Sequence, residues 1–233
     1  MVPIPFQHIG KGVYSLAEAE RLIKIPRRRI SRWTHSCTYR YKGEAHHTPP
    51  LIAWDIEQPA DKGPILSFLD LLEVRFLDAF LVHGVSRKAV RIAALHAREL
   101  LGRHHPFSTR IFKTDGHSIF AEIVRGTDDK HLLDVVKNQF VFARIISPSL
   151  YEGVEFNASN DPERWWPLGK KHTVVIDPER GFGAPIVARS GVPTRILANA
   201  IKAEGSVDFV AKWYEVTPRE VRDAVKFEEQ LAV

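Results

Sequence analysis

Four arginines near the N-terminus have the spacing of one charged face of a short helix: Arg27, Arg28, Arg29 and Arg32. On a helix of about 3.6 residues per turn, Arg28 and Arg32 lie one turn apart on the same face, with Arg29 beside Arg32. A guanidinium group can donate two hydrogen bonds to a guanine base or hold a backbone phosphate. We therefore interpret this face as a candidate DNA-binding surface, against the simpler alternative of a solvated charge run.

The positive charge of the chain is concentrated around these arginines. Residues 1–48 contain nine Lys and Arg and three Glu, whereas the whole chain of 233 residues carries a net charge of +5. The first segment thus holds +6 and the remainder sums to −1. A localised positive field of this kind attracts a polyanion, most often a nucleic acid.

Two short helices are expected to position the arginines. Ser15 and Glu18 have the spacing of a capping box for the first helix, and Pro26 is well placed to start the second. The second helix turns Ile30 and Trp33 toward the core, on the side away from the arginines. The pattern predicts two helices joined by a tight turn.

A short hairpin, or wing, is expected after the second helix. The residues that alternate there as in a β-strand are Tyr39, Arg40, Tyr41 and Lys42. They have the aromatic and basic character of a wing that reaches phosphates or the minor groove, and we include all four as DNA-binding candidates. Inward packing of the two tyrosines is an equally open alternative.

The middle of the chain contains more apolar surface than one helix normally buries. Apolar residues occupy one face of the helix predicted at 65–82 and also crowd the neighbouring faces, so we expect a homodimer that would bind an inverted-repeat operator. A further helix with a buried stripe follows and ends at Gly102. Beyond it, residues 109–114 and 117–123 flank an Asp-Gly pair at 115–116, which favours a β-hairpin.

The segment 13–33 resembles the helix-turn-helix of MerR-type regulators: a capped first helix, a short turn and a second helix with a basic exposed face. The resemblance extends through residues 66–102, where a long apolar helix, a break and another helix follow. It implies that the second helix enters the major groove of DNA. The lone Cys37 does not supply the cysteine array with which such regulators sense metals.

Four segments in the last third of the chain carry a second pattern, at 176–179, 183–187, 191–193 and 217–224. They resemble a small bacterial domain of unknown function that occurs in antitoxins. Three short helices are expected there, starting at Pro193, at Ser206 and at Thr217 with Pro218. Together, the two resemblances are those of the longer VapB-type antitoxins, whose partners are PIN-family ribonucleases.

We therefore predict a mainly α protein: a winged helix-turn-helix with small β hairpins, plus a small three-helix C-terminal domain. The expected division is a DNA-binding and dimerisation domain at 1–145, a connecting segment at 146–171 and an antitoxin domain at 172–233. The resemblance implies an antitoxin of a type II toxin–antitoxin system that represses its own operator and neutralises a PIN-type ribonuclease. The alternative is a stand-alone MerR-like transcription regulator without a toxin.

Two stretches combine apolar and basic side chains that could cover an acidic nuclease cleft. The candidates are Trp165, Trp166, Lys170 and Lys171 in the connecting segment, and Arg219 and Arg222 in the final helix. We favour the connecting segment, because long connections often carry binding residues. The alternative is that both tryptophans anchor this connection in the core.

No residue is expected to catalyse a reaction or to bind a metal or cofactor. The histidine pairs at 46–47 and 104–105 lack the four-ligand spacing of a zinc site, so surface histidines are expected. Asp177 and Glu179 lie at a predicted turn, where carboxylates serve as caps. With one cysteine and no evident leader or long apolar span, we expect a cytoplasmic, non-enzymatic protein.

Overall fold

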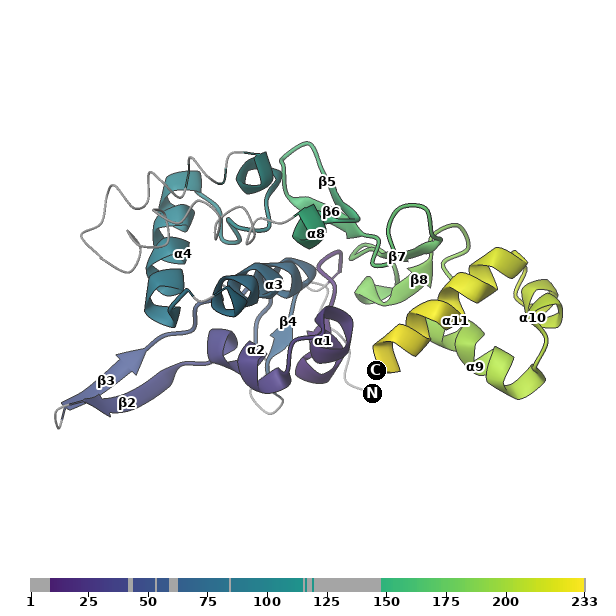
Figure 1. Ribbon diagram of the computed structural model, residues 1–233, viewed down its shortest axis with the longest axis horizontal. Coiled ribbons are helices and arrows are strands. Elements are labelled where there is room, and N and C mark those ends of the chain that lie inside the picture. The colour runs from purple at the N-terminus through teal and green to yellow at the C-terminus, as the bar shows by residue number, and fades with distance from the viewer. Residues whose placement is uncertain are drawn as a thin grey trace.

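Figure 1 shows the computed structural model, which describes residues 9–41, 44–52, 54–58, 63–83, 85–114, 116, 119 and 148–232. Across these ranges the chain is mainly helical, with short antiparallel strands and a group of three helices at the C-terminal end. The predicted fold class is confirmed. None of the helices in these ranges is long and apolar enough to cross a membrane.

The helix-turn-helix is followed directly by its wing. The elements are β1 (Tyr14–Ser15), α1 (Leu16–Ile23), α2 (Arg27–Thr34), β2 (Cys37–Tyr41) and β3 (Glu44–Thr48). The capping box predicted for α1 is present: the Glu18 amide donates to the Ser15 hydroxyl at 3.2 Å, and the Ser15 amide donates to the Glu18 carboxylate at 2.9 Å. Strands β2 and β3 pair antiparallel and project away from the helices (Figure 1).

We call the described residues up to 119 the N-terminal half and residues 148–232 the C-terminal half. Helix α3 (Phe68–Val82) fills the centre of the N-terminal half and is buried on most sides. Strand β4 (Ile65–Leu66), which pairs with β1, precedes it, and α4 (Arg87–Leu101) follows it. Later segments cover the faces that α4 leaves open: Phe76 packs on Tyr151 with 4.6 Å between ring centroids, and Phe80 packs on Phe107 with 5.2 Å. The apolar excess that we attributed to a dimer interface is therefore largely absorbed within one chain.

The β-hairpin predicted around residues 115–116 is wrong in its first strand. Residues 110–114 are helical, and the Phe112 amide donates to the Thr109 hydroxyl at 3.2 Å, so Thr109 caps this helix. The helical conformation lets Phe112 join the core, where it is fully buried. Most of the predicted second strand, at 117–123, lies outside the described residues.

A four-stranded antiparallel sheet joins the two halves of the protein. In spatial order, its strands are β5 (Val154–Phe156), β6 (Pro162–Trp165), β7 (Val174–Ile176) and β8 (Pro185–Val187). The segment 146–171, expected to be a connection, contributes the short helix α8 (Pro148–Tyr151) and two of these strands. Strands β6 and β7 meet where Trp165 lies opposite Ile176, and both side chains are buried.

Three helices form the C-terminal end: α9 (Thr194–Glu204), α10 (Val207–Trp213) and α11 (Pro218–Ala232). They begin where the sequence predicted. The Ser206 hydroxyl caps α10 by accepting from the Phe209 amide at 3.3 Å. At the start of α11, the Thr217 amide donates to the Glu220 carboxylate at 2.6 Å and the Glu220 amide donates to the Thr217 hydroxyl at 3.3 Å. These helices have their own apolar core, centred on Leu197.

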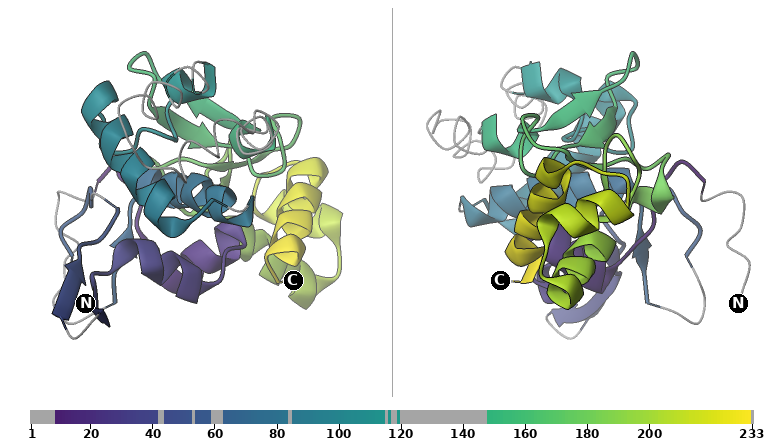
Figure 2. Two further views of the ribbon diagram at one scale, coloured as in Figure 1. Left: turned by 60° about the vertical axis from the view of Figure 1, so that its left-hand side comes forward. Right: turned by 90° about the vertical axis from the view of Figure 1, so that its right-hand side faces the viewer.

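Helix α1 lies against helix α11 of the C-terminal group (Figure 2). Just before α1, the Val13 amide donates to the Phe182 carbonyl at 3.0 Å, and the Tyr14 hydroxyl donates to the Gly183 carbonyl at 2.9 Å. Just after it, the Lys24 ammonium donates to a backbone carbonyl near the end of α11. The helix-turn-helix is thus attached to the C-terminal half at both ends of α1.

Candidate functional site

The turn between α1 and α2 sets the direction of the arginine helix. The Glu20 carboxylate accepts from the Arg27 amide at 3.0 Å and from the Arg27 Nε at 2.6 Å. These contacts supply the N-terminal cap that the side chain of Pro26 cannot provide. They also lower the pKa of the Glu20 carboxyl, and the amide hydrogen bond has the largest effect.

Arg29 connects α2 to α3. Its Nε donates to Asp78 Oδ1 at 2.7 Å, and its Nη2 donates to the second oxygen of the same carboxylate. Asp78 is buried, so this bidentate pair compensates a charge that has no other ion-pair partner among the described residues. Arg27 and Arg29, two of the four arginines predicted to bind DNA, therefore both have partners within the chain.

Arg28 and Arg32 are the two remaining arginines of α2. Both side chains are exposed, and neither has a hydrogen bond or ion pair within the described part of the chain. On the opposite side of α2, Ile30 and Trp33 are buried, as predicted, at 0% and 2% exposure. Two guanidinium groups, one helical turn apart, are thus available to an external anion.

The wing lies directly beyond α2. Three of its candidate residues, Tyr39, Arg40 and Tyr41, lie on β2 in antiparallel register with β3, and Lys42 lies outside the described residues. The amides of residues 51 and 52 donate to the Trp33 carbonyl at 2.8 and 3.1 Å. These two hydrogen bonds attach the chain that follows β3 to the C-terminal end of α2, at the base of the hairpin.

The first of the two tryptophans expected to contact a partner belongs to the core. Trp165 is 6% exposed, and the Arg75 guanidinium of α3 lies over its ring, 4.5 Å from the ring centroid. Trp166 is partly buried, and its amide donates to the Gly153 carbonyl at 2.9 Å. For Trp165, the structure thus shows the anchoring role that the sequence left open as the alternative.

The basic candidates of the C-terminal half lie at the surface. Lys170 forms an ion pair with Glu155 at 3.1 Å, and the Arg219 guanidinium donates to the backbone carbonyl of Lys171. Arg222 is exposed and has no partner among the residues that the structure describes. Arg219 thus ties the backbone of Lys171 to the start of α11, where Arg222 follows three residues later.

Two exposed aromatic residues were not identified from the sequence. Phe209 and Trp213 stack on the outer face of α10 with 6.0 Å between ring centroids, and they are 49% and 72% exposed. Their spacing of four residues in a helix capped by Ser206 could have revealed them. Helix α10 buries Val210 and Ala211, so the aromatic pair faces solvent.

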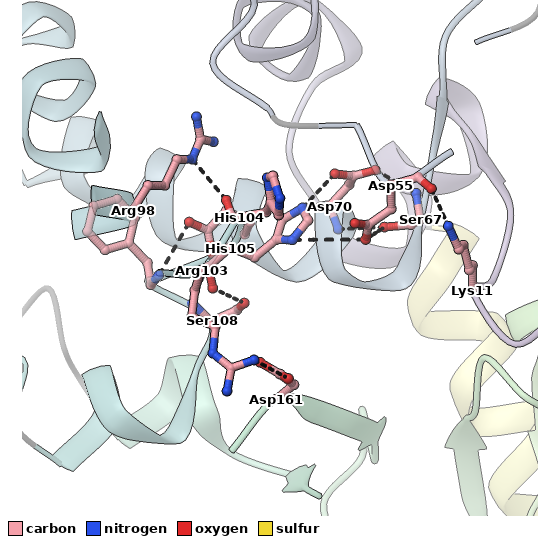
Figure 3. A network of polar contacts seen from close by, with 12 residues as sticks. Lys11, Asp55, Ser67, Asp70, Arg98, Arg103, His104, His105, Ser108 and Asp161 are labelled. Atoms are coloured by element: carbon pink, nitrogen blue, oxygen red, sulfur yellow. Dashed lines mark hydrogen bonds and ion pairs between the residues drawn. The ribbon is translucent and has the colours of Figure 1, made fainter. Parts of the chain in front are cut away.

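A buried polar network lies between α3 and the segment that follows α4 (Figure 3). The Nε2 atom of His105 lies 2.8 Å from Asp70 Oδ1, and its Nδ1 atom lies 3.9 Å from Asp55 Oδ2. The expectation of surface histidines is correct for His104, which is exposed, and wrong for His105, which is 5% exposed. The two carboxylates compensate the imidazole and so permit its burial.

The charges around His105 favour its protonated form. Burial alone would lower the pKa of His105, but the hydrogen bond that its ring donates to Asp70 and the negative charges of Asp70, Glu73 and Asp55 raise it above the usual 6.5. Burial also raises the pKa of the Glu73 carboxyl, which accepts from the Ser108 amide at 2.9 Å. The carboxylates around His105 thus oppose the cost of burying its charged form.

The same cluster has the residue types of a metal site. Ligand atoms of Asp55, Asp70 and His105 lie within 4.8 Å of one another. A metal ion would need one ring nitrogen and both carboxylates to converge on a single point. Here, opposite nitrogens of the ring face the two carboxylates, so the imidazole lies between them and does not share a single point with both. The arrangement fits an ion network better than a metal centre.

The chain is similar to known proteins over most of its length. Residues 174–227 match a family model described as a protein of unknown function (DUF433). Over 228 residues, the chain is 28% identical to a protein of Mycobacterium tuberculosis (strain ATCC 25618 / H37Rv) named "Putative antitoxin VapB45", with 91% of this chain and 92% of that protein covered. The X-ray crystal structure of Rv2018 from Mycobacterium tuberculosis is also similar, with a TM-score of 0.68 and 25% identity, covering 91% of this chain and 96% of that one. The resemblance to VapB-type antitoxins predicted from the sequence is confirmed.

Proposed function

We propose that the protein is the antitoxin of a type II toxin–antitoxin pair, which represses its own operator and neutralises a PIN-type ribonuclease in the cytoplasm. The antitoxin role is supported by similarity to the Mycobacterium tuberculosis protein across 91% of the chain. Because this similarity includes the arginine helix as well as the DUF433 segment, the proposal concerns the combination of both halves. We propose a regulator and not an enzyme.

One observation carries the DNA-binding part of the proposal: Arg28 and Arg32 project from α2 without partners in the described part of the chain. The second helix of a helix-turn-helix enters the major groove, where arginine binds guanine or phosphate. Arg29 orients α2 through its ion pair with Asp78. Arg27 is proposed to leave its surface ion pair with Glu20 and to bind a DNA phosphate instead. The wing residues Tyr39, Arg40, Tyr41 and Lys42 are proposed to contact the neighbouring backbone.

Binding to the DNA upstream of the protein's own gene tests this assignment. Replacing Arg28 or Arg32 with Ala should weaken binding, and loss of a phosphate contact should lower the salt dependence by about one unit. If an arginine reads a base, its loss should relax specificity at one position. Arg222→Ala removes an equally exposed, unpaired arginine from α11 and serves as the matched control. Unchanged affinity of the Arg28→Ala/Arg32→Ala double variant would show that α2 does not read DNA.

We propose that the toxin binds the outer surface of the C-terminal helices. The resemblance implies a nuclease with an acidic, metal-holding cleft, which an apolar anchor flanked by basic side chains can cover. Phe209 and Trp213 supply the exposed anchor, and Arg219 and Arg222 supply positive charge. Lys170 and Lys171 add charge from the loop before β7, which Trp165 and Trp166 hold in position.

Co-expression with the product of the neighbouring gene tests the antitoxin role. The intact protein should restore growth that the toxin alone arrests. The Arg219→Gln/Arg222→Gln variant should restore it less well, because the acidic cleft then lacks opposing charge. Arg28→Ala is the control, since it affects the DNA-binding helix alone. A toxin that stays lethal beside the intact protein would remove the antitoxin role and leave the stand-alone regulator as the function.

A homodimer remains part of the proposal, on an inverted-repeat operator. Other segments of the same chain cover α3. The support for a dimer therefore comes from Leu95 and Leu100 of α4, which are 50% and 44% exposed. Light scattering at micromolar concentration should give the mass of two chains. A monomer that binds a single half-site would contradict the dimer without affecting the assignment of α2.

A further inference from the structure

Arg75 of α3 carries a charge that no carboxylate compensates among the described residues. Its Nη1 atom is buried and has no hydrogen-bond partner there. The contact that holds the guanidinium is the face of Trp165, 4.5 Å away at the ring centroid. Burial lowers the pKa of Arg75 to about 10. Protein interiors normally pair such a charge with an anion.

The same side chain lines a pocket of about 280 Å³ at the junction of the two halves. Its walls come from α3, from the loop between β6 and β7, and from α11, which contributes Lys226 and Gln230. Lys226 is exposed and has no partner within the described ranges. Glu152 also lines the pocket, and no ion pair joins it to either cation in the described part of the chain.

We propose that this pocket binds a small oxyanion, a carboxylate or a phosphate, between Arg75 and Lys226. A guanidinium donates two parallel hydrogen bonds to such an anion, and an ammonium adds a compact positive charge. The amide of Gln230 offers a further neutral donor. The volume admits inorganic phosphate or a short dicarboxylate together with water.

An anion in this position joins the two halves of the protein. Arg75 belongs to the core of the N-terminal half, and Lys226 belongs to α11. Further along α11, Glu228 pairs with Arg21 of α1 at 3.6 Å. Anion binding therefore fixes α11 against both α3 and the helix pair that carries Arg28 and Arg32. This site goes beyond the proposed antitoxin function and does not depend on it.

Thermal unfolding and calorimetric titration of the full chain test the site, with sodium phosphate and sodium succinate as separate probes. Sodium chloride at matched ionic strength controls for general salt effects. We expect saturable binding and a rise in Tm with at least one probe, and the preferred probe identifies phosphate or carboxylate as the ligand chemistry. Arg75→Gln and Lys226→Gln should each weaken binding about tenfold or more, since each removes a charged donor.

Two further variants make the result decisive. Glu152→Gln removes a negative charge from the pocket and should strengthen anion binding. Lys202→Gln removes an exposed positive charge from α9, outside the pocket, and should leave binding unchanged. If Arg75→Gln fails to fold, Lys226→Gln and Glu152→Gln still test the site. No saturable binding, or equal binding by Lys226→Gln, Glu152→Gln and the intact protein, would overturn it.

Discussion

The four arginines of α2 have the same chemistry but different surroundings. Arg28 and Arg32 are exposed and lack partners within the described residues, whereas Arg29 is joined to buried Asp78. Arg29 should therefore contribute mainly to stability, and Arg28 and Arg32 mainly to DNA binding. An arginine that pairs with a buried carboxylate stabilises the fold, and one that faces solvent is available to a ligand.

Replacing Arg29 with Ala should lower the free energy of unfolding by about 1–3 kcal/mol, because it leaves the Asp78 carboxylate buried without a donor. Arg28→Ala and Arg32→Ala should each change it by less than about 0.5 kcal/mol. Urea denaturation measures all three. In the Asp78→Asn background, Arg29→Ala should cost less, and an unchanged cost would mean that the pair does not stabilise α2.

His105 should make stability depend on pH. Burial opposes its charge, but Asp70 and the neighbouring carboxylates raise its pKa above 6.5 in the folded state. Protonation therefore stabilises the fold fully below the unfolded-state value, and this contribution is lost as pH rises through the folded-state pKa. Urea unfolding of the intact protein should show decreasing stability across this range. His105→Gln should flatten the profile, whereas His104→Gln, at the exposed neighbour, should leave it unchanged.

At the scale of elements, short local signals determine where helices start. Ser15 with Glu18 and Thr217 with Glu220 both form the reciprocal capping contacts that their spacing predicts. Helix α10 shows what such signals leave undecided. Its cap at Ser206 fixes the start of the helix, but the face that the helix buries depends on α9 and α11.

Replacing both Phe209 and Trp213 with Ala should leave the protein folded, because the pair is exposed and its stacking contributes only about 1 kcal/mol. The same double variant should lose rescue of growth in the toxin co-expression assay, since the apolar anchor is removed. Ile196→Ala on α9, at a residue that is 42% exposed, is the matched control. Full rescue by a folded double variant would exclude α10 as the toxin contact.

At the scale of the whole molecule, the helix-turn-helix and the C-terminal half share a close backbone contact. Gly183 has a φ of +80°, and a Cβ atom there would overlap the Tyr14 hydroxyl and lie 3.1 Å from the Gly12 Cα. Glycine is therefore required both by the backbone conformation and by the approach of β1. This contact couples the docking of the two halves to the loop before β8.

Gly183→Ala should destabilise the protein and open the contact between the halves. Gly205→Ala provides the control, because Gly205 has a φ of +70° and an added Cβ atom there would meet nothing within 4 Å. The cost of this substitution therefore measures backbone strain alone, about 1–2 kcal/mol. The overlap with Tyr14 should add about 1–3 kcal/mol at Gly183. Urea denaturation gives the energies, and limited proteolysis reports the opening. Equal effects of both substitutions would show that the Tyr14 contact is not tight.

The sequence by itself determined the fold class, the capped starts of α1, α10 and α11, the wing strands and the arginine face. These features depend on periodicity and on capping partners three residues apart, so a short stretch of sequence is enough to specify each of them. Tertiary structure decided which arginines are free, since Arg29 finds Asp78 49 positions away. It also placed His105 beside Asp70, 35 positions away, and drew Trp165 into the core. Burial and ion pairing depend on segments that are distant in sequence, and only the folded chain brings those segments together.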